Sequence, residues 1–253
     1  MKYIYRKTPG ITFKSRKSEL FLDIKVINKA IENFNTTIDK ITLSEINIFN
    51  VLGMRNLSAF IGEVFAASII SASKGMFLKN PHQDGYPDLL AMTAEGIQEW
   101  ERLKNNLRDK KPFSPFIEGG IEIKATCGSL PTPAVFARKS LQKPDIGDTR
   151  IDYVTGYDWK AHHRLTSNLM SIFWDFVDRK PVIVAVFYSD SNLTEEDWGI
   201  IIQPKDGGGR TTSVSIMTRQ GVRKMYEGWV AVLNEPRYIA FFNRYNKGDL
   251  IGK

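Results

Sequence analysis

The sequence predicts a single α/β domain in which helices cover both faces of a sheet. Helical and strand-like patterns alternate along the chain, with no internal repeat and no linker that separates two cores. The 253 residues fit one sizeable domain, because single hydrophobic cores stop growing near ~250 residues. With 42% hydrophobic and 25% charged residues, the composition is close to the globular average, which excludes disordered, collagen-like and coiled-coil chains.

The first 55 residues predict an N-terminal helical arm. Apolar residues recur near the helical period between Phe21 and Phe34, and a second short helix is expected from Leu43 to Leu52. A stronger helix follows from Asn56 to Ser73. Its apolar stripe is joined by alanines on the adjoining face, so we expect this helix to be mostly buried.

Two strand candidates and a charged helix come next. A short apolar run, Leu89 to Met92, predicts the first strand, and Thr93 to Leu107 predicts the helix. Ile121 to Thr126, behind two glycines, predicts the second strand. The stretch 128–160 is rich in Pro, Gly, Asp and basic residues and predicts long loops, which in a compact domain are usually functional.

The rest of the chain alternates between the two patterns. Leu165 to Val177 shows helical spacing, and two helices are expected at the end, Thr218 to Leu233 and Glu235 to Tyr245. Three strands are predicted between the helix at 165–177 and these two helices. The second of them resembles a buried strand, and a glycine-rich hairpin turn joins it to the third. These strands are Val182 to Tyr188, Trp198 to Gln203 and Thr211 to Met217.

Cysteine count and hydropathy exclude several classes of protein. The single cysteine, Cys127, cannot form an intramolecular disulfide, and with only three histidines a structural zinc site is not expected. The N-terminus lacks the apolar region of a signal peptide, and we find no apolar run near the ~18 residues of a membrane span. We therefore expect a soluble, cytoplasmic protein.

The net charge of +7, with a pI near 9.3, suggests a polyanionic partner. Residues 1–17 carry six basic residues and no acidic one. The stretches 124–164 and 200–253 carry a smaller basic excess. The alternative is that these basic segments only keep the protein in solution.

Pro87-Asp88 and, 34 positions later, Glu122-Ile123-Lys124 are the residues that point to chemistry. Strand alternation places Glu122 and Lys124 on the same side of a sheet. A carboxylate and an ammonium in the buried part of a strand must be paired, solvated or bound to a metal. The alternative is a plain salt bridge between Glu122 and Lys124, with Asp88 capping a turn.

Magnesium accounts for this group economically. It takes oxygen ligands and keeps several waters, so Asp88, Glu122 and the backbone carbonyl of Ile123 would suffice to bind it. Lys124 would then orient or help deprotonate an attacking water, or stabilise the charge that builds on a scissile phosphate.

The segments Gly85 to Leu90 and Gly120 to Thr126 together resemble the P-D…(D/E)-x-K nucleases, above all the type II restriction endonucleases. The resemblance is specific for about 40 residues, roughly 85–126. It implies a restriction-endonuclease-like mixed central β-sheet flanked by helices on both faces. It also implies hydrolysis of phosphodiester bonds with Mg²⁺, for which Mn²⁺ can substitute, and commonly a homodimer. A DNA methyltransferase of the same specificity is then expected in the host.

By this resemblance Asp88 and Glu122 are the metal ligands and Lys124 is the catalytic lysine. The spacing of 34 residues is wide, so the helix expected at 93–107 would be an insertion between the two catalytic strands. Asp84 is a weaker rival for Asp88, because no strand follows it directly.

Glu63 is a fourth candidate, because it interrupts a nearly all-apolar helix. A carboxylate without a partner would be costly there. The resemblance implies that it binds the metal through water. The alternative is that Glu63 lies in a solvated groove between helices.

Three basic segments are candidates for DNA contact, because lysine, arginine, histidine and threonine side chains are common partners of phosphates and base edges. Glycines in the second segment would let the backbone approach a groove closely. The candidates are Lys160, His162, His163 and Arg164 before the predicted helix, Arg210, Thr211 and Thr212 after the glycines, and Arg138, Lys139, Lys143 and Arg150 in the long loop.

We therefore expect a magnesium-dependent type II restriction endonuclease that cuts double-stranded DNA at a short specific sequence. One nuclease domain would span 1–253, with the helical arm at 1–55 and catalytic core elements at 56–126. Residues 127–253 would supply the recognition loops, the remaining strands and the C-terminal helices. A structure-specific repair or junction-resolving nuclease is one alternative, and a catalytically inactive, sequence-specific DNA-binding protein is another.

Overall fold

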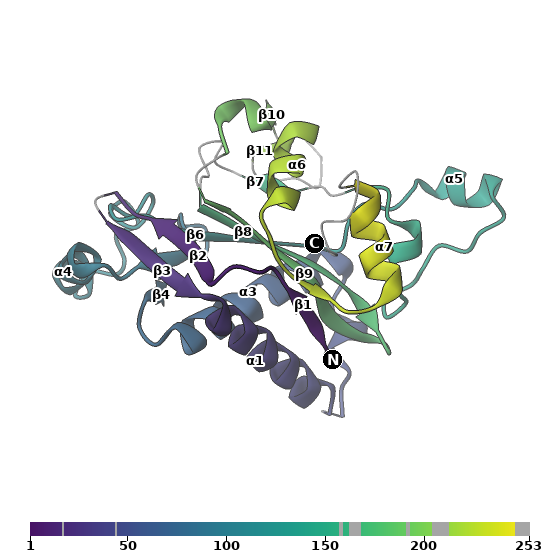
Figure 1. The fold of residues 1–253 in the computed structure, drawn as a ribbon, viewed down its shortest axis with the longest axis horizontal. Helices are drawn as coiled ribbons and strands as arrows, with labels where there is room; N and C mark the ends of the chain where they lie inside the picture. Colours follow the sequence, from purple (N-terminus) through teal and green to yellow (C-terminus); the bar gives the residue numbers. More distant parts are fainter. Residues whose placement is uncertain are drawn as a thin grey trace.

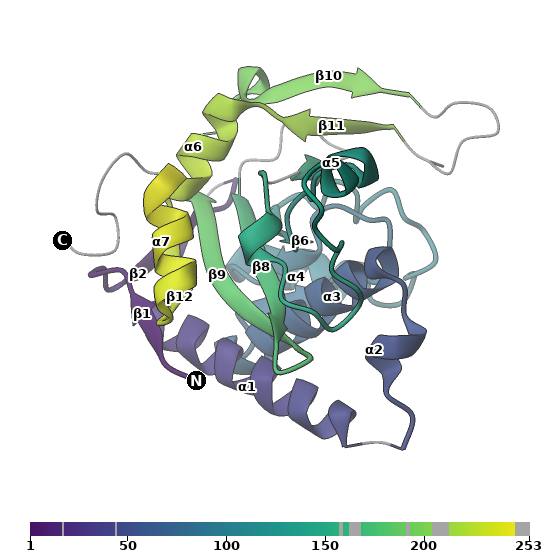
Figure 2. The same cartoon turned by 90° about the vertical axis from the view of Figure 1, so that its right-hand side faces the viewer.

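A mixed β-sheet forms the centre of the molecule, and helices pack on both of its faces (Figure 1, Figure 2). The computed structural model describes residues 1–16, 18–43, 45–156, 159–161, 168–190, 193–203 and 213–245. For four of these residues, which lie within helices or strands, it describes the backbone only: Asn50, Arg55, Asp190 and Tyr245. The expected α/β class, a sheet with helices on both faces, is confirmed.

The elements have the following bounds. The helices are α1 (Ile24–Thr42), α2 (Ile48–Val51), α3 (Met54–Ser73), α4 (Ala94–Leu103), α5 (Pro133–Arg138), α6 (Arg219–Glu227) and α7 (Pro236–Tyr245), with short 3-10 turns η1 (Ile151–Tyr153) and η2 (Glu195–Asp197). The strands are β1 (Tyr3–Tyr5), β2 (Gly10–Lys14), β3 (Glu19–Asp23), β4 (Phe77–Lys79), β5 (Leu89–Ala91), β6 (Gly120–Thr126), β7 (Lys160–Ala161), β8 (Asn168–Val177), β9 (Lys180–Asp190), β10 (Trp198–Ile202), β11 (Val214–Met217) and β12 (Trp229–Leu233).

Within the described residues, seven strands form the main sheet in the order β1-β12-β9-β8-β6-β5-β4. The β6–β8 pair is parallel and the other pairs are antiparallel. A smaller sheet has the order β10-β11-β7, and β2 pairs with β3 as a hairpin. The pairing of β10 with β11 confirms the hairpin that the sequence predicts.

β8 lies in the middle of this arrangement and is buried on both faces. Its residues Met170, Ile172 and Trp174 pack in one apolar cluster with α1 and α3, whereas Leu169 and Phe173 pack in a second cluster with α6 and α7. The helix predicted at 165–177 is therefore wrong where the structure describes it. A strand covered on both sides is apolar at nearly every position, and such a run cannot be told from a buried helix by periodicity.

The N-terminal arm is helical only in part. β1 adds an edge strand to the main sheet beside β12, and the β2–β3 hairpin precedes α1. Phe21, which we expected on a helix, belongs to β3 and is 50% exposed, next to the fully buried Leu22. α1 begins after Asp23, whose Oδ1 accepts the N–H of Lys25 at 2.7 Å.

The helix predicted at 218–233 is also shorter than expected. α6 ends at Glu227, and Trp229–Leu233 forms the buried strand β12 between β1 and β9. Only glycine fits between α6 and β12, because a Cβ at Gly228 would lie 2.0 Å from the carbonyl oxygen of Tyr188.

Two expectations about exposure need correction. β10 is not a buried strand, since Ile200 is 83% exposed. One window of the described chain, Asn56–Ser73, has the length and hydropathy of a membrane span, although we expected no such run. In the structure this window belongs to α3, whose residues Leu57, Ile61 and Phe65 are fully buried in the core, and core helices can meet the same criteria.

Candidate active site

The candidate site lies where β5 and β6 separate. β5 pairs with β6 only at Leu89 with Ile121 and Leu90 with Gly120, whereas β6 continues alongside β8 as far as Thr126. On the N-terminal side of Leu89 the backbone no longer pairs with β6. The Asp88 side chain takes the place of a strand partner there, because the N–H of Ile123 donates to Asp88 Oδ2 at 2.7 Å. The edge of β6 from Ile123 onward therefore opens into a cavity.

The backbone at this fork is held closely by local sequence. A Cβ at Gly120 would lie 1.7 Å from the carbonyl oxygen of Leu89 and 2.4 Å from Cγ of Pro87, so only glycine fits. Asn80 is 3% exposed, and its Nδ2 donates to the carbonyls of Pro87 and Phe113, each at 2.9 Å. Pro87 and Asp88 are thereby fixed beside β6.

Glu122 and Lys124 lie on the same face of β6, as strand alternation predicts, and form a direct ion pair between Lys124 Nζ and Glu122 Oε1. The side chain of Glu122 is 6% exposed and that of Lys124 is 23% exposed. The second carboxylate oxygen, Glu122 Oε2, is buried and has no hydrogen-bond partner among the described residues. A buried carboxylate oxygen without a donor is costly unless it meets a cation or water.

The pKa values of Asp88 and Lys124 are both raised, for different reasons. Burial first, and the charge of Glu122 second, raise the pKa of Asp88 to about 7. For Lys124, burial acts to lower the pKa, but the charges of Glu122 and Asp88 prevail and the pKa is raised. Lys124 is therefore a stable cation at neutral pH, next to a carboxyl group that ionises only near neutrality.

A cavity of about 290 Å³ opens between α3 and this edge of β6. Three small residues of α3, Ala59, Gly62 and Ala66, line this space. Glu122 does not line the cavity, although it contacts Lys124, which does. The lining residues are Ser58, Ala59, Gly62, Glu63, Ala66, Lys79, Asn80, His82, Gln83, Asp88, Ile123, Lys124 and Ala125.

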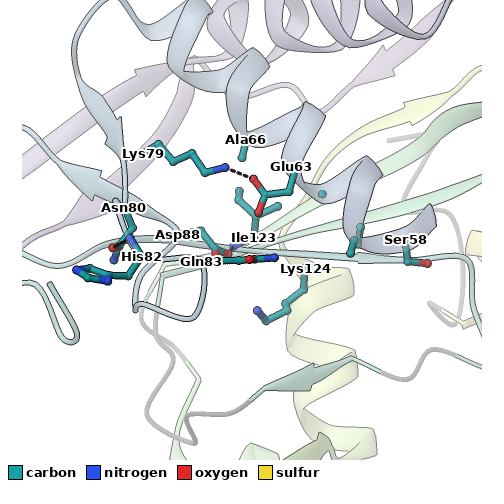
Figure 3. Close-up of a pocket in the computed structure, with 13 residues that line it drawn as sticks. Ser58, Glu63, Ala66, Lys79, Asn80, His82, Gln83, Asp88, Ile123 and Lys124 are labelled. Carbon is teal, nitrogen blue, oxygen red and sulfur yellow. Dashed lines mark hydrogen bonds and ion pairs between the residues drawn. The ribbon is translucent and has the colours of Figure 1, made fainter. Parts of the chain in front are cut away.

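Glu63 lines this cavity, as the fourth candidate should, but its carboxylate already has a partner. Lys79, the last residue of β4, donates to Glu63 Oε2 (Figure 3). In this view the two side chains meet on one side of β6, and Lys124 points away from them. Both members of the pair are about half exposed, with 59% of Lys79 and 47% of Glu63 accessible.

The residues at the fork fit a magnesium ion. The described part of the chain holds no group of three His, Cys, Asp or Glu side chains able to bind a metal, so a cation here would depend on fewer protein ligands. Magnesium accepts this, because one or two carboxylates plus waters are its usual protein ligands. The unpartnered Glu122 Oε2 and the carboxyl of Asp88 supply them. Because the N–H and C=O of a strand residue face the same side, the carbonyl of Ile123 also faces Asp88.

No sequence pattern points to Lys79. It ends a three-residue strand, β4, which is too short to give a periodic pattern before the turn-rich segment 80–88. Asp84, the rival of Asp88, is exposed and paired with Lys110 at 2.6 Å, and it does not line the cavity.

The predicted DNA-contact residues divide into three groups. Lys160, Arg138 and Lys139 are exposed, as is Lys143, and α5 with its loop stands out from the body of the molecule (Figure 1). Arg150 is only 7% exposed and donates to Met54 Sδ at 3.8 Å, so its expected place on the loop surface is wrong. Outside the described residues lie His162, His163, Arg164, Arg210, Thr211 and Thr212.

Comparison with known proteins gives no relative from which a role could be transferred: no protein-family model, no curated protein and no solved structure matches the chain significantly.

Proposed function

We propose that the protein is a magnesium-dependent endonuclease of the type II restriction class, which cuts double-stranded DNA at a short specific sequence. The observation that carries this proposal is the convergence of Asp88, Glu122 and Lys124 at the fork between β5 and β6. The N–H of Ile123 holds Asp88 in place, and one oxygen of the buried Glu122 lacks a partner. The mixed sheet with helices on both faces supports a restriction-endonuclease-like fold.

Each residue has a role that follows from its surroundings. Asp88 and Glu122, with the carbonyl of Ile123, would hold Mg²⁺ or Mn²⁺, and the ion when bound polarises the phosphate and activates a water. Lys124 keeps its proton because two carboxylates raise its pKa, so it acts as a cation rather than as a base. Its Nζ would donate hydrogen bonds to the nucleophile or to the phosphate oxygens, where negative charge builds in the transition state.

The exposed cations and the net charge of +7 support DNA as the partner. Lys160, Arg138 and Lys139 would contribute to phosphate binding, because exposed lysines and arginines are the usual donors to the DNA backbone. A homodimer on a two-fold symmetric site, and a methyltransferase of the same specificity in the host, belong to the same proposal.

Digestion of a sequenced plasmid tests the function. The wild-type protein should produce discrete fragments in Mg²⁺ or Mn²⁺ and none in EDTA, and sequencing the ends should reveal one common site. Smeared products or cutting only at junctions would favour the repair alternative. A specific shift of DNA with no cleavage in either metal would favour the inactive DNA-binding alternative.

Lys124→Ala tests the chemistry. We expect cleavage to fall by a factor of at least about 100, with DNA binding nearly intact, since removing one transition-state donor costs ~10² to 10³ in rate. Lys104→Ala is the matched control, because Lys104 is also paired with a glutamate, Glu101, but lies at the end of α4 outside the cavity. Cleavage by Lys124→Ala within tenfold of the wild type would refute this role.

A further inference from the structure

Three carboxyl groups but only two paired lysines lie at or beside the cavity. Each of two lysines is paired with one carboxylate, Lys79 with Glu63 and Lys124 with Glu122. Among the residues that the structure describes, no lysine forms an ion pair with Asp88, which accepts a hydrogen bond from the N–H of Ile123. Asp88 and the second oxygen of Glu122 are therefore the acceptors left for an added cation, whereas the Glu63 carboxylate already binds an ammonium.

Lys79 reaches Glu63 from a different element. It ends β4, the edge strand of the main sheet, and Glu63 lies on α3, which packs against β4. Lys79 and Glu63 both line the cavity, and they meet on the side from which Lys124 points away (Figure 3). Because Lys79 and Glu63 are about half exposed, the pair contributes little to stability, so substitutions at either residue should leave the fold intact.

We propose that Lys79 is a positioning residue that restricts this site to one divalent cation, held by Asp88 and Glu122. Its ammonium group binds the Glu63 carboxylate and provides the positive charge that a second metal ion would otherwise bring. The proposal rests on the proposed nuclease function and deepens it. A second divalent cation in the cavity would need the oxygens of Glu63, and it would have to displace the Lys79 ammonium and tolerate its charge. Glu63 is then the partner of Lys79 rather than a metal ligand.

Counting bound Mn²⁺ tests this inference without reference to cleavage. The full-length protein would be titrated with Mn²⁺, and the free ion measured by electron paramagnetic resonance. We expect one bound ion for the wild type and two for Lys79→Met. The double variant Lys79→Met/Glu63→Gln should return to one, because it lacks the carboxylate that the second ion needs.

Two further variants serve as controls. Lys29→Met removes a lysine of similar exposure from an ion pair, with Glu32 at 3.2 Å on α1, and should still bind one ion. Asp88→Asn should weaken binding of the single ion at least tenfold. Circular dichroism of each variant would verify that it folds.

The outcomes separate the inference from the proposed function. Two ions in the wild type with cleavage intact, or one ion in Lys79→Met, would overturn the role of Lys79 and leave the nuclease standing. No bound ion and no cleavage by the wild type would overturn both. Unchanged binding in Asp88→Asn would place the ion elsewhere and overturn the assignment as well.

Discussion

Asp88 combines burial with a neighbouring carboxylate, and both act against its ionisation. Its pKa in the folded protein is about 7, against a value of 3.8 for an unperturbed aspartate. As the pH rises from about 4 to 7, the unfolded chain gives up this proton while the folded protein keeps it, so stability falls over that range. The metal-free protein therefore contains a destabilising charge above pH 7, which a bound cation would offset.

Asp88→Asn is expected to stabilise the metal-free protein at pH 8. The amide carries no charge, and its Oδ1 can still accept the N–H of Ile123. The gain in the free energy of unfolding should be on the order of 1 to 3 kcal/mol and should vanish below about pH 4. Urea unfolding in EDTA between pH 4 and pH 8 measures it.

The exposed Asp84 offers a matched control for this prediction. Its pKa is lowered, mainly by the hydrogen bond from Lys110, so Asp84→Asn should give no gain. A loss of stability in Asp88→Asn at pH 8 would show that the ionised form of Asp88 is favoured in the fold, contrary to the prediction.

Residue identity alone made Asp88, Glu122 and Lys124 predictable. Glu122 and Lys124 lie in an apolar strand and Asp88 directly precedes one, and charged groups at such places need a reason to be buried. Lys79 was not predictable, because its role depends on a contact between an edge strand and a helix. Arg150 shows the opposite failure: a basic residue in a loop-rich segment looked exposed, but the fold buries it.

Among the elements, β8 anchors the long loop that carries α5. Asp175 on β8 is fully buried and accepts the N–H of Arg150 at 2.8 Å and that of Ile151 at 3.1 Å. It also accepts the N–H of Phe176 at 2.8 Å and the hydroxyl of Tyr238 at 3.2 Å. The end of the loop is thereby fixed to the strand next to β6.

Asp175→Ala is expected to destabilise the protein by roughly 3 kcal/mol or more, because it leaves several buried donors unpaired at about 1 to 3 kcal/mol each. Chemical denaturation at neutral pH measures the loss. Asp148→Ala, in the same region but 48% exposed and 3.6 Å from Arg179, should change stability by less than about 0.5 kcal/mol. Equal effects of the two substitutions would contradict an anchoring role for Asp175.

Elements with a polar face were predictable, and so was β9, which is covered on both faces but has the β-branched composition typical of a strand. α3 was expected from Asn56 to Ser73 and extends from Met54 to Ser73. β6 was expected from Ile121 to Thr126 and begins one residue earlier, at Gly120. The patterns of β8 and β12 predict helices instead, because strands buried on both faces lose the alternation that identifies them.

At the scale of the whole molecule, the basic charge is the property to test. If DNA phosphates are its partners, the logarithm of the affinity should fall linearly with the logarithm of the salt concentration. For about six phosphate contacts, a rise from about 50 to about 200 mM salt should weaken binding roughly 10³-fold. Fluorescence anisotropy with labelled duplex DNA in EDTA measures this slope.

Variants can assign part of that slope to the α5 loop. Arg138→Gln/Lys139→Gln, both exposed, should reduce the slope by about two if each side chain meets a phosphate. Lys29→Gln on α1 should leave it unchanged. A slope near zero in the wild-type protein would exclude phosphate contacts as the use of the net charge.

The sequence by itself determined the α/β class, most helices and the three residues of the candidate site, because periodicity and buried charge are local signals. Only the tertiary structure decided that β8 and β12 are strands, that Lys79 meets Glu63, and that Asp88 takes the place of a strand partner on Ile123. The reason is that burial on two faces and contacts between distant elements depend on how the layers pack, and no short segment of the chain encodes that packing.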